Sequence, residues 1–240
     1  MESLAFKISW RVVIYPALIY AVFSFIFFYL YTHPGRNLSA FTPAASGFRF
    51  EAVKFVTSDG VELAGWYLPN TRSKKAVIVC HGYPMDKGDI FGLASFLAED
   101  FNLLLFDFRA MGGSKGFFST GVERELKDID AALAFLRTKG FERAGLFGFS
   151  LGAAVALMSG NPAAAARVAD SPFADVAGEL NYVFAGFGAF RHPLIWLMKA
   201  WCRLLLGVNV DRVSPITAIP GLTAPALIIN GYADTQVPVQ

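Results

Sequence analysis

An uninterrupted apolar run near the N-terminus differs from everything that follows it. Residues 12–32, VVIYPALIYAVFSFIFFYLYT, contain no charged side chain. As a helix they would extend about 31 Å, enough to cross a hydrocarbon core of roughly 30 Å. The run therefore predicts a retained, single-pass transmembrane helix. A buried core helix and a cleaved signal peptide are the alternatives, but the apolar region of a signal peptide usually has only about 7 to 15 residues.

The charges that flank this run indicate an orientation. Lys7 and Arg11 precede it, whereas His33 and Arg36 follow it. Because cytoplasmic flanks carry the excess of Lys and Arg, residues 1–11 are expected on the cytoplasmic side. The rest of the chain is then expected on the non-cytoplasmic side of the membrane.

Beyond a Pro-containing and Ser-containing stretch at 33–47, which we interpret as a linker, the pattern is that of a folded domain. Two alternating runs flank the turn sequence TSDG and predict an antiparallel hairpin. Residues 123–140 place leucine and isoleucine at spacings of three and four, which indicates a helix. Short apolar runs alternate with such helical stretches and predict a mostly parallel sheet with helices on both faces. These runs are 76–80, 102–107, 144–149 and 226–230.

Composition narrows the class of protein. Apolar residues make up 55% of the 240-residue chain, which excludes disorder, and a net charge of +2 gives no basis for a nucleic-acid partner. The two cysteines, Cys80 and Cys202, lack C-x-x-C spacing, and no two of the three histidines have the spacing of helical metal ligands. We therefore expect neither a disulfide framework nor a metal site. The oligomeric state is left open.

The sequence GFSLG at 148–152 lies between an apolar run and a helical stretch. A nucleophilic serine needs a tight strand-to-helix turn, and glycines two residues to each side let neighbouring backbones approach. The following helix N-terminus favours developing negative charge. This context makes Ser150 a candidate nucleophile. The alternative is an ordinary glycine-rich turn in which the serine is a helix N-cap.

A second loop, HGYPMDKGD at 81–89, directly follows the apolar run that ends at Cys80. Its backbone is expected to face an oxyanion, with the N–H groups of Tyr83 and Leu151 as the two donors. His81 is expected to hold the loop by hydrogen bonds and is not assigned as a general base.

Together these motifs resemble the alpha/beta hydrolase family. DFRAMGGSKG at 107–116 is similar to the family's D-x-R-x-x-G-x-S-x-G loop, with Ala110 and Met111 where many members carry Gly and His. DSPFAD at 170–175 and GYADTQVP at 231–238 resemble the segments after the sixth and seventh strands in the serine aminopeptidase-like and X-prolyl dipeptidyl peptidase-like branch. The resemblance implies the alpha/beta hydrolase fold, without a cofactor.

The resemblance covers about residues 48–240 and implies a catalytic triad. It makes Ser150 the nucleophile and Asp234 the acid, with a histidine expected after Asp234, where this sequence has none. We therefore expect that the sequence is a fragment without the last strand and helix, and that it is weak or inactive as a catalyst. The alternative is a catalytically silent binding or scaffolding module at the membrane.

His192, Asp170 and a cap segment also have expected roles. His192 is a weak candidate for a base that approaches from above, and Asp170 is expected to be structural. The cap is expected at about 176–214, where one apolar stripe along 194–205 is predicted to pack down on the pocket. The implied substrate is a small or lipid-like acyl ester or amide. A transferase with the same serine is also compatible with these motifs.

Overall fold

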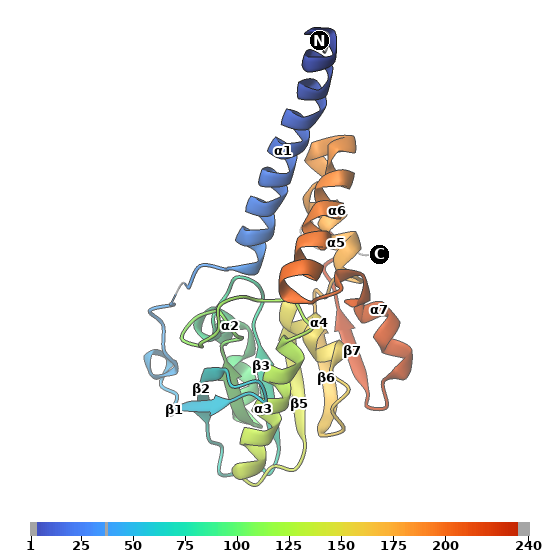
Figure 1. Ribbon diagram of the computed structural model, residues 1–240. Coiled ribbons are helices and arrows are strands. Elements are labelled where there is room, and N and C mark those ends of the chain that lie inside the picture. Colours follow the sequence, from blue (N-terminus) through green and yellow to red (C-terminus); the bar gives the residue numbers. More distant parts are fainter. Residues whose placement is uncertain (1–3, 37, 235–240) are drawn as a thin grey trace.

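A long N-terminal helix, α1 (Leu4–Thr32), projects from a layered α/β domain and runs beside helices α5 and α6 for part of its length (Figure 1). The computed structural model describes residues 4–36 and 38–234, with side chains described from Trp10 onward. Residues Trp10–Thr32 are apolar and long enough to cross a membrane, a property that a signal sequence near an N-terminus shares.

Within the described residues, seven strands form one sheet in the order β1-β2-β4-β3-β5-β6-β7. The pairs β1–β2 and β2–β4 are antiparallel, and the other neighbours are parallel. This arrangement confirms the predicted opening hairpin and the mostly parallel sheet. The strands are β1 (Glu51–Val56), β2 (Glu62–Leu68), β3 (Ala76–Cys80), β4 (Asn102–Phe106), β5 (Ala144–Phe149), β6 (Ala164–Asp170) and β7 (Ala226–Ile229).

Helices cover both faces of the sheet, as the alternating pattern predicts. On one face α3 and α4 pack through a cluster that includes Ile129, Leu133 and Leu136. On the other face α2 packs through Ile90 and Phe91. The helical elements are α2 (Lys87–Ala94), α3 (Glu125–Thr138), α4 (Leu151–Met158), α5 (Val176–Val183), α6 (Arg191–Trp201), α7 (Pro215–Ala218), the 3₁₀ turns η1 (Pro43–Ser46), η2 (Ser95–Glu99), η3 (Ala185–Phe190), η5 (Val210–Arg212) and η6 (Ile219–Gly221), and the π-helical turn η4 (Cys202–Leu206).

Strand β6 is the element that the hydrophobic pattern does not predict. Its sequence, AAARVAD, lacks a run of large apolar residues and contains the buried Arg167. The Arg167 guanidinium donates to the carbonyl oxygens of Ala156 at 2.9 Å and Ser159 at 2.7 Å. Arg167 thereby satisfies carbonyl groups at the C-terminal end of α4, which explains a buried cation in a central strand.

The cap helices pack against α1, so the prediction that their apolar stripe packs down on the pocket is wrong. Leu194 and Met198 of α6 are buried in one cluster with Phe28 of α1. Further along the predicted stripe, Leu204 and Leu205 are exposed. The π-helical turn η4 widens the helical repeat there, so residues that a regular helix would place on the packed face turn outward.

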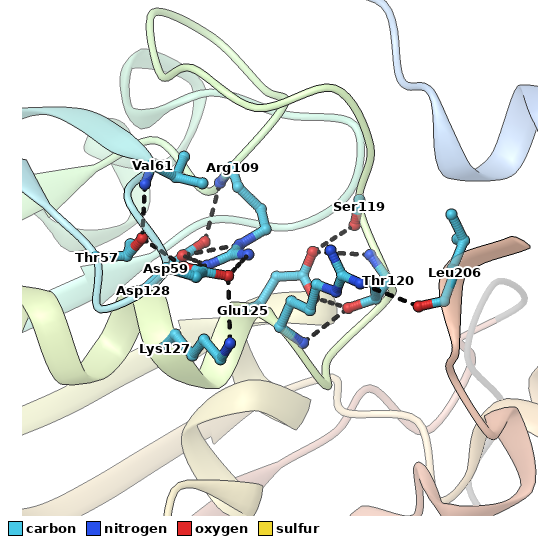
Figure 2. A network of polar contacts seen from close by, with 11 residues as sticks. Thr57, Asp59, Val61, Arg109, Ser119, Thr120, Glu125, Lys127, Asp128 and Leu206 are labelled. Carbon is cyan, nitrogen blue, oxygen red and sulfur yellow. Dashed lines mark hydrogen bonds and ion pairs between the residues drawn. The ribbon is translucent and has the colours of Figure 1, made fainter.

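A buried charge network links α3 to the β1–β2 turn (Figure 2). Arg109 donates from Nε and Nη2 to Asp128 at 2.9 and 2.6 Å, and from Nη1 to Asp59 at 2.8 Å. The Arg109 guanidinium holds the pKa of Asp59 well below its ordinary range. Arg109 and Asp128 are both almost fully buried, so the stability of each charge depends on the other.

Replacement of Asp128 by Asn is expected to lower the free energy of unfolding by about 3 kcal/mol, because it leaves the buried Arg109 charge incompletely paired. At about 2–4 °C per kcal/mol, the melting midpoint in detergent falls by roughly 6–12 °C, as measured by scanning fluorimetry. The matched control is Asp130→Asn at an exposed position of α3, expected to change stability by less than about 0.5 kcal/mol. Equal midpoints for the two variants would contradict this account.

Candidate active site

Ser150 occupies a sharp turn between β5 and α4. Its backbone angles are φ 49° and ψ −113°, a conformation that residues other than glycine rarely adopt. Its N–H donates to the carbonyl oxygen of Asp170, the last residue of β6, at 2.9 Å. The Ser150 side chain makes no hydrogen bond that caps α4. The geometry therefore favours a partly exposed, strained serine over the alternative of an ordinary helix N-cap.

The two glycines of GFSLG are required by close backbone contacts. A Cβ atom at Gly152 would lie 2.2 Å from the carbonyl oxygen of Cys80, at the end of β3. A Cβ atom at Gly148 would lie 2.3 Å from the carbonyl oxygen of Gly152. Both separations are far below van der Waals contact, so a side chain at either position would displace the turn.

The loop after β3 passes directly beside Ser150. A Cβ atom at Gly82 would lie 3.3 Å from the Ser150 Cβ, so the backbone that leads into Tyr83 is close to the serine. Leu151 is the first residue of α4, where amide groups have no acceptor within the helix. The Tyr83 hydroxyl donates to the Leu30 carbonyl oxygen of α1 at 3.2 Å, and burial raises the pKa of Tyr83 to about 12.

His81 holds this loop through both ring nitrogens. The Phe108 N–H donates to His81 Nε2 at 2.9 Å, so Nδ1 carries the proton and donates to the Gly82 carbonyl oxygen at 2.7 Å. Burial lowers the pKa of His81 and keeps the ring neutral. With both nitrogens engaged by the backbone, His81 has the structural contacts that the sequence predicts.

The candidate acids lie at the ends of the next two strands of the sheet after β5, namely β6 and β7. Asp170 ends β6, and its carboxylate accepts a hydrogen bond from the Ser171 hydroxyl at 3.1 Å. Asp234 lies in the turn after β7, with its N–H donating to the Gly231 carbonyl oxygen at 3.1 Å. Ser150, Asp170 and Asp234 therefore lie at the carboxyl ends of parallel neighbours, the edge where open α/β sheets bind ligands.

A pocket of about 210 Å³ opens beside Ser150 and is enclosed by segments far apart in the sequence. Its lining joins the end of α1, the loop after β3, the loop between β4 and α3, the start of α4, the segment after β6 and helix α5. The residues are Tyr31, Tyr83, Ser119, Gly121, Ser150, Leu151, Phe173, Val176, Glu179, Leu180 and Val183.

Glu179 and Tyr31 are pocket residues that sequence reasoning missed. Burial raises the pKa of Glu179, and the nearby Asp234 carboxylate raises it further. This coupling indicates that the Asp234 charge lies close to the pocket wall. No local pattern marks either residue, since Tyr31 lies in the apolar run and Glu179 in a short cap helix.

Within the described ranges the histidines lie outside the Ser150 pocket. His33 stacks on Tyr29 of α1, and His192 is exposed on α6. Within residues 4–36 and 38–234, no group of three His, Cys, Asp or Glu side chains could hold a metal ion.

Known proteins are similar to this chain in sequence. The family model described as alpha/beta hydrolase family matches residues 77–239. An uncharacterized protein of Mycobacterium tuberculosis H37Rv is 36% identical over 187 residues, covering 76% of this chain and 61% of that protein. This chain therefore spans less than two thirds of that relative's length. YfhR of Salmonella typhi is 30% identical over 230 residues, covering 87% of this chain and 71% of that protein.

Solved structures show the same fold. The esterase Pf2001 of Pyrococcus furiosus is 30% identical, with a TM-score of 0.72. The aligned region covers 86% of this chain and 80% of the esterase. An acylaminoacyl peptidase of Pyrococcus horikoshii is 22% identical, with a TM-score of 0.56. The aligned region covers 80% of this chain and 33% of the peptidase, and this likeness shows the shared fold alone. The family match, the strand order and the turn at Ser150 show that this chain belongs to the alpha/beta hydrolase family.

Proposed function

We propose that this protein is a membrane-anchored serine hydrolase that cleaves a carboxylic ester, with Ser150 as the nucleophile. The observation that carries the proposal is the strained backbone of Ser150 at the wall of a pocket, directly beside the loop that contains Tyr83. The similarity to a solved esterase supports an ester over an amide substrate. The apolar lining from Leu180 and Val183 fits an acyl chain.

In the proposed reaction, Ser150 Oγ forms a bond to the ester carbonyl carbon as its proton passes to the catalytic base, which later gives this proton to the leaving alcohol. The carbonyl oxygen becomes an oxyanion. The N–H groups of Tyr83 and Leu151 stabilise this charge, and the amide donors need no reorganisation because the turn already fixes them. Collapse of the intermediate breaks the bond to the alcohol, which leaves with a proton, and an acyl group remains on Ser150. Water then releases the acid and restores the serine.

Asp234 is proposed as the acid that orients the catalytic base. No histidine among the described residues takes the place between Ser150 and Asp234, so the base is not assigned to any of them. For residues 1–240 alone we propose weak hydrolysis, because an oxyanion hole and binding by themselves retain roughly 10³ to 10⁴-fold acceleration.

Helix α1 is proposed as a retained anchor rather than a cleaved signal. The side chains from Val12 to Leu30 are mostly exposed and apolar, as a lipid-facing helix requires. The end of the same helix lines the pocket through Tyr31, so removal of α1 would remove part of the site. The weak charge asymmetry supports a domain on the non-cytoplasmic side.

A fluorophosphonate probe is expected to label the protein expressed from its complete gene at Ser150, because the probe reacts with activated serines. Labelling should disappear in Ser150→Ala and persist in Ser119→Ala, which changes another serine of the same pocket. Peptide mass spectrometry locates the label. A wild-type protein that does not react would favour the silent binding module, and equal labelling of Ser150→Ala would place the nucleophile elsewhere.

The charge of Glu179 is expected to oppose the reaction of a neutral ester. As pH rises through the raised pKa of Glu179, the carboxylate forms and repels the developing oxyanion. The ratio of kcat/KM for Glu179→Gln over wild type should therefore be near unity at low pH. Above the Glu179 pKa it should rise to about tenfold, or ~1.4 kcal/mol.

The measurement is a pH profile of kcat/KM with a neutral aryl ester. Glu179→Asp is the control. Because it retains the carboxylate, its kcat/KM should fall with rising pH as that of the wild type does. A ratio that does not change with pH would show that the Glu179 charge does not act on the reacting carbonyl.

The mature protein is expected to contain residues 12–32 and to resist extraction from membranes by alkaline carbonate, because a helix of this length spans the hydrocarbon core. Intact-mass analysis of the membrane fraction provides the check. A mature N-terminus located after residue 32 would identify a cleaved signal and remove the anchor from the proposal.

A further inference from the structure

The cap forms a helical hairpin, α5–η3–α6, that lies along α1 (Figure 1). Specific contacts fix this arrangement along the C-terminal part of α1. The Tyr20 hydroxyl donates to the Phe190 carbonyl oxygen at the tip of the hairpin, and Trp201 Nε1 donates to Ser24 Oγ at 3.1 Å. The Phe27 ring packs edge-on against Phe184 with centroids 5.2 Å apart.

The length of α1 limits where a bilayer can lie. The part that contacts the hairpin, from Tyr20 to Thr32, covers about 13 residues or ~20 Å. The part of the helix before Tyr20 covers about 16 residues or ~24 Å, which is shorter than a hydrocarbon core of roughly 30 Å. If α1 crosses the membrane, the hydrocarbon must therefore extend over part of the hairpin as well.

The surface of the hairpin fits such an environment. Its tip, residues 184–190, has the sequence FAGFGAF without a charged or polar side chain. Phe190 is 72% exposed and Trp196 is 68% exposed. Exposed apolar side chains of α1 lie on the same helix whose Phe27 ring contacts Phe187 of the hairpin tip, and the exposed apolar side chains of the two elements together are called here the apolar surface. Its exposed members are Val22, Phe23, Phe25, Ile26, Tyr29, Leu30, Tyr182, Val183, Phe187, Phe190 and Trp196.

The hairpin carries Glu179, which lines the Ser150 pocket, and two cations, Arg191 and Lys199, which have local partners. Arg191, at the start of α6, donates to the Gly188 carbonyl oxygen at 3.2 Å. Its aliphatic part can lie along apolar surface while the guanidinium keeps this contact. Lys199, near the end of α6, pairs with Asp211 at 2.5 Å. The tip itself presents only apolar side chains.

We propose that the hairpin tip enters the leaflet beside α1, and that the Ser150 pocket takes a lipid ester directly from that leaflet. The second half rests on the proposed hydrolase function. The pocket supports it, because Tyr31 of α1 and Leu180 and Val183 of α5 line the pocket and belong to the two elements that form the apolar surface. An acyl chain can then pass from hydrocarbon to the pocket along apolar side chains.

Insertion is tested without reference to catalysis. An environment-sensitive NBD label is placed at Phe190→Cys in the full chain, in a Cys202→Ala background, while Cys80 is fully buried. The matched control is Phe96→Cys, which is exposed on η2. In phosphatidylcholine vesicles, the label at position 190 should emit at shorter wavelength and be quenched by lipids with a nitroxide on the acyl chain.

The label at position 96 should remain unquenched in the same vesicles. Equal, unquenched emission at both positions would overturn the insertion. The emission at position 190 could instead change with the ratio of protein to lipid and not respond to the quencher lipid. That result would assign the apolar surface to contact with a second copy of the chain, and it would also overturn the insertion.

Substrate access is tested with two esters that share a leaving group. Phe190→Asp should lower kcat/KM about tenfold for 4-methylumbelliferyl oleate in phosphatidylcholine vesicles, because a carboxylate at the tip opposes insertion. It should leave kcat/KM for the water-soluble acetate unchanged, as should Phe96→Asp for both esters.

The outcomes separate the two proposals. Unchanged hydrolysis of the oleate by Phe190→Asp would overturn lateral access while leaving the hydrolase function intact. Wild-type protein that cleaves neither ester would contradict the proposed function and, with it, the substrate class. Quenching of the label at position 190 would still report insertion in that case.

Discussion

The contact between the Cys80 carbonyl oxygen and Gly152 is the constraint on which the site depends. A Cβ atom at Gly152 would lie 2.2 Å from that oxygen, so the end of β3 and the start of α4 can meet only through glycine. This contact fixes the turn that holds Ser150 at φ 49°. Because Tyr83 follows Cys80 by three residues, the same contact brings its loop beside the serine. One close approach between two backbones therefore places both the serine and the loop proposed to stabilise an oxyanion.

Three consecutive residues after β4 hold the surrounding elements in register with this site. Asp107 accepts from the Lys87 N–H at 2.7 Å and pairs with its ammonium at 2.6 Å, which fixes the start of α2. Phe108 donates to His81 and sets the tautomer of the loop histidine. Arg109 binds Asp128 of α3 and the turn after β1. Buried charges of this kind contribute little net stability when complete but a large penalty when one partner is removed, so they specify one arrangement of the loops.

Helix α1 belongs to the wall of the site as well as to the N-terminal segment. The Ser119 N–H donates to the Thr32 carbonyl oxygen at 2.7 Å, and Arg36 donates to Gly116 at 2.6 Å. These contacts attach the end of α1 to the loop between β4 and α3, close to Tyr31 in the pocket. If α1 crosses a bilayer, the pocket lies at the boundary between lipid and water. The position of the site and its proposed preference for acyl chains then follow from the same packing.

Features that depend on neighbouring residues could be predicted from the sequence: the hairpin at TSDG, a helix within 123–140, the parallel strands with large apolar runs, and the strand-to-helix turn at Ser150. Each has a local signal, because turn geometry and helical periodicity are set within a few residues. The packing of the cap stripe against α1 and the meeting of Tyr31 and Glu179 at the Ser150 pocket are set only in the folded chain. The same holds for the bounds of β6, a strand that the family resemblance implies but the hydrophobic pattern does not show. These features rest on contacts between segments distant in the chain, such as Arg167 with the end of α4, and no local pattern encodes such a contact.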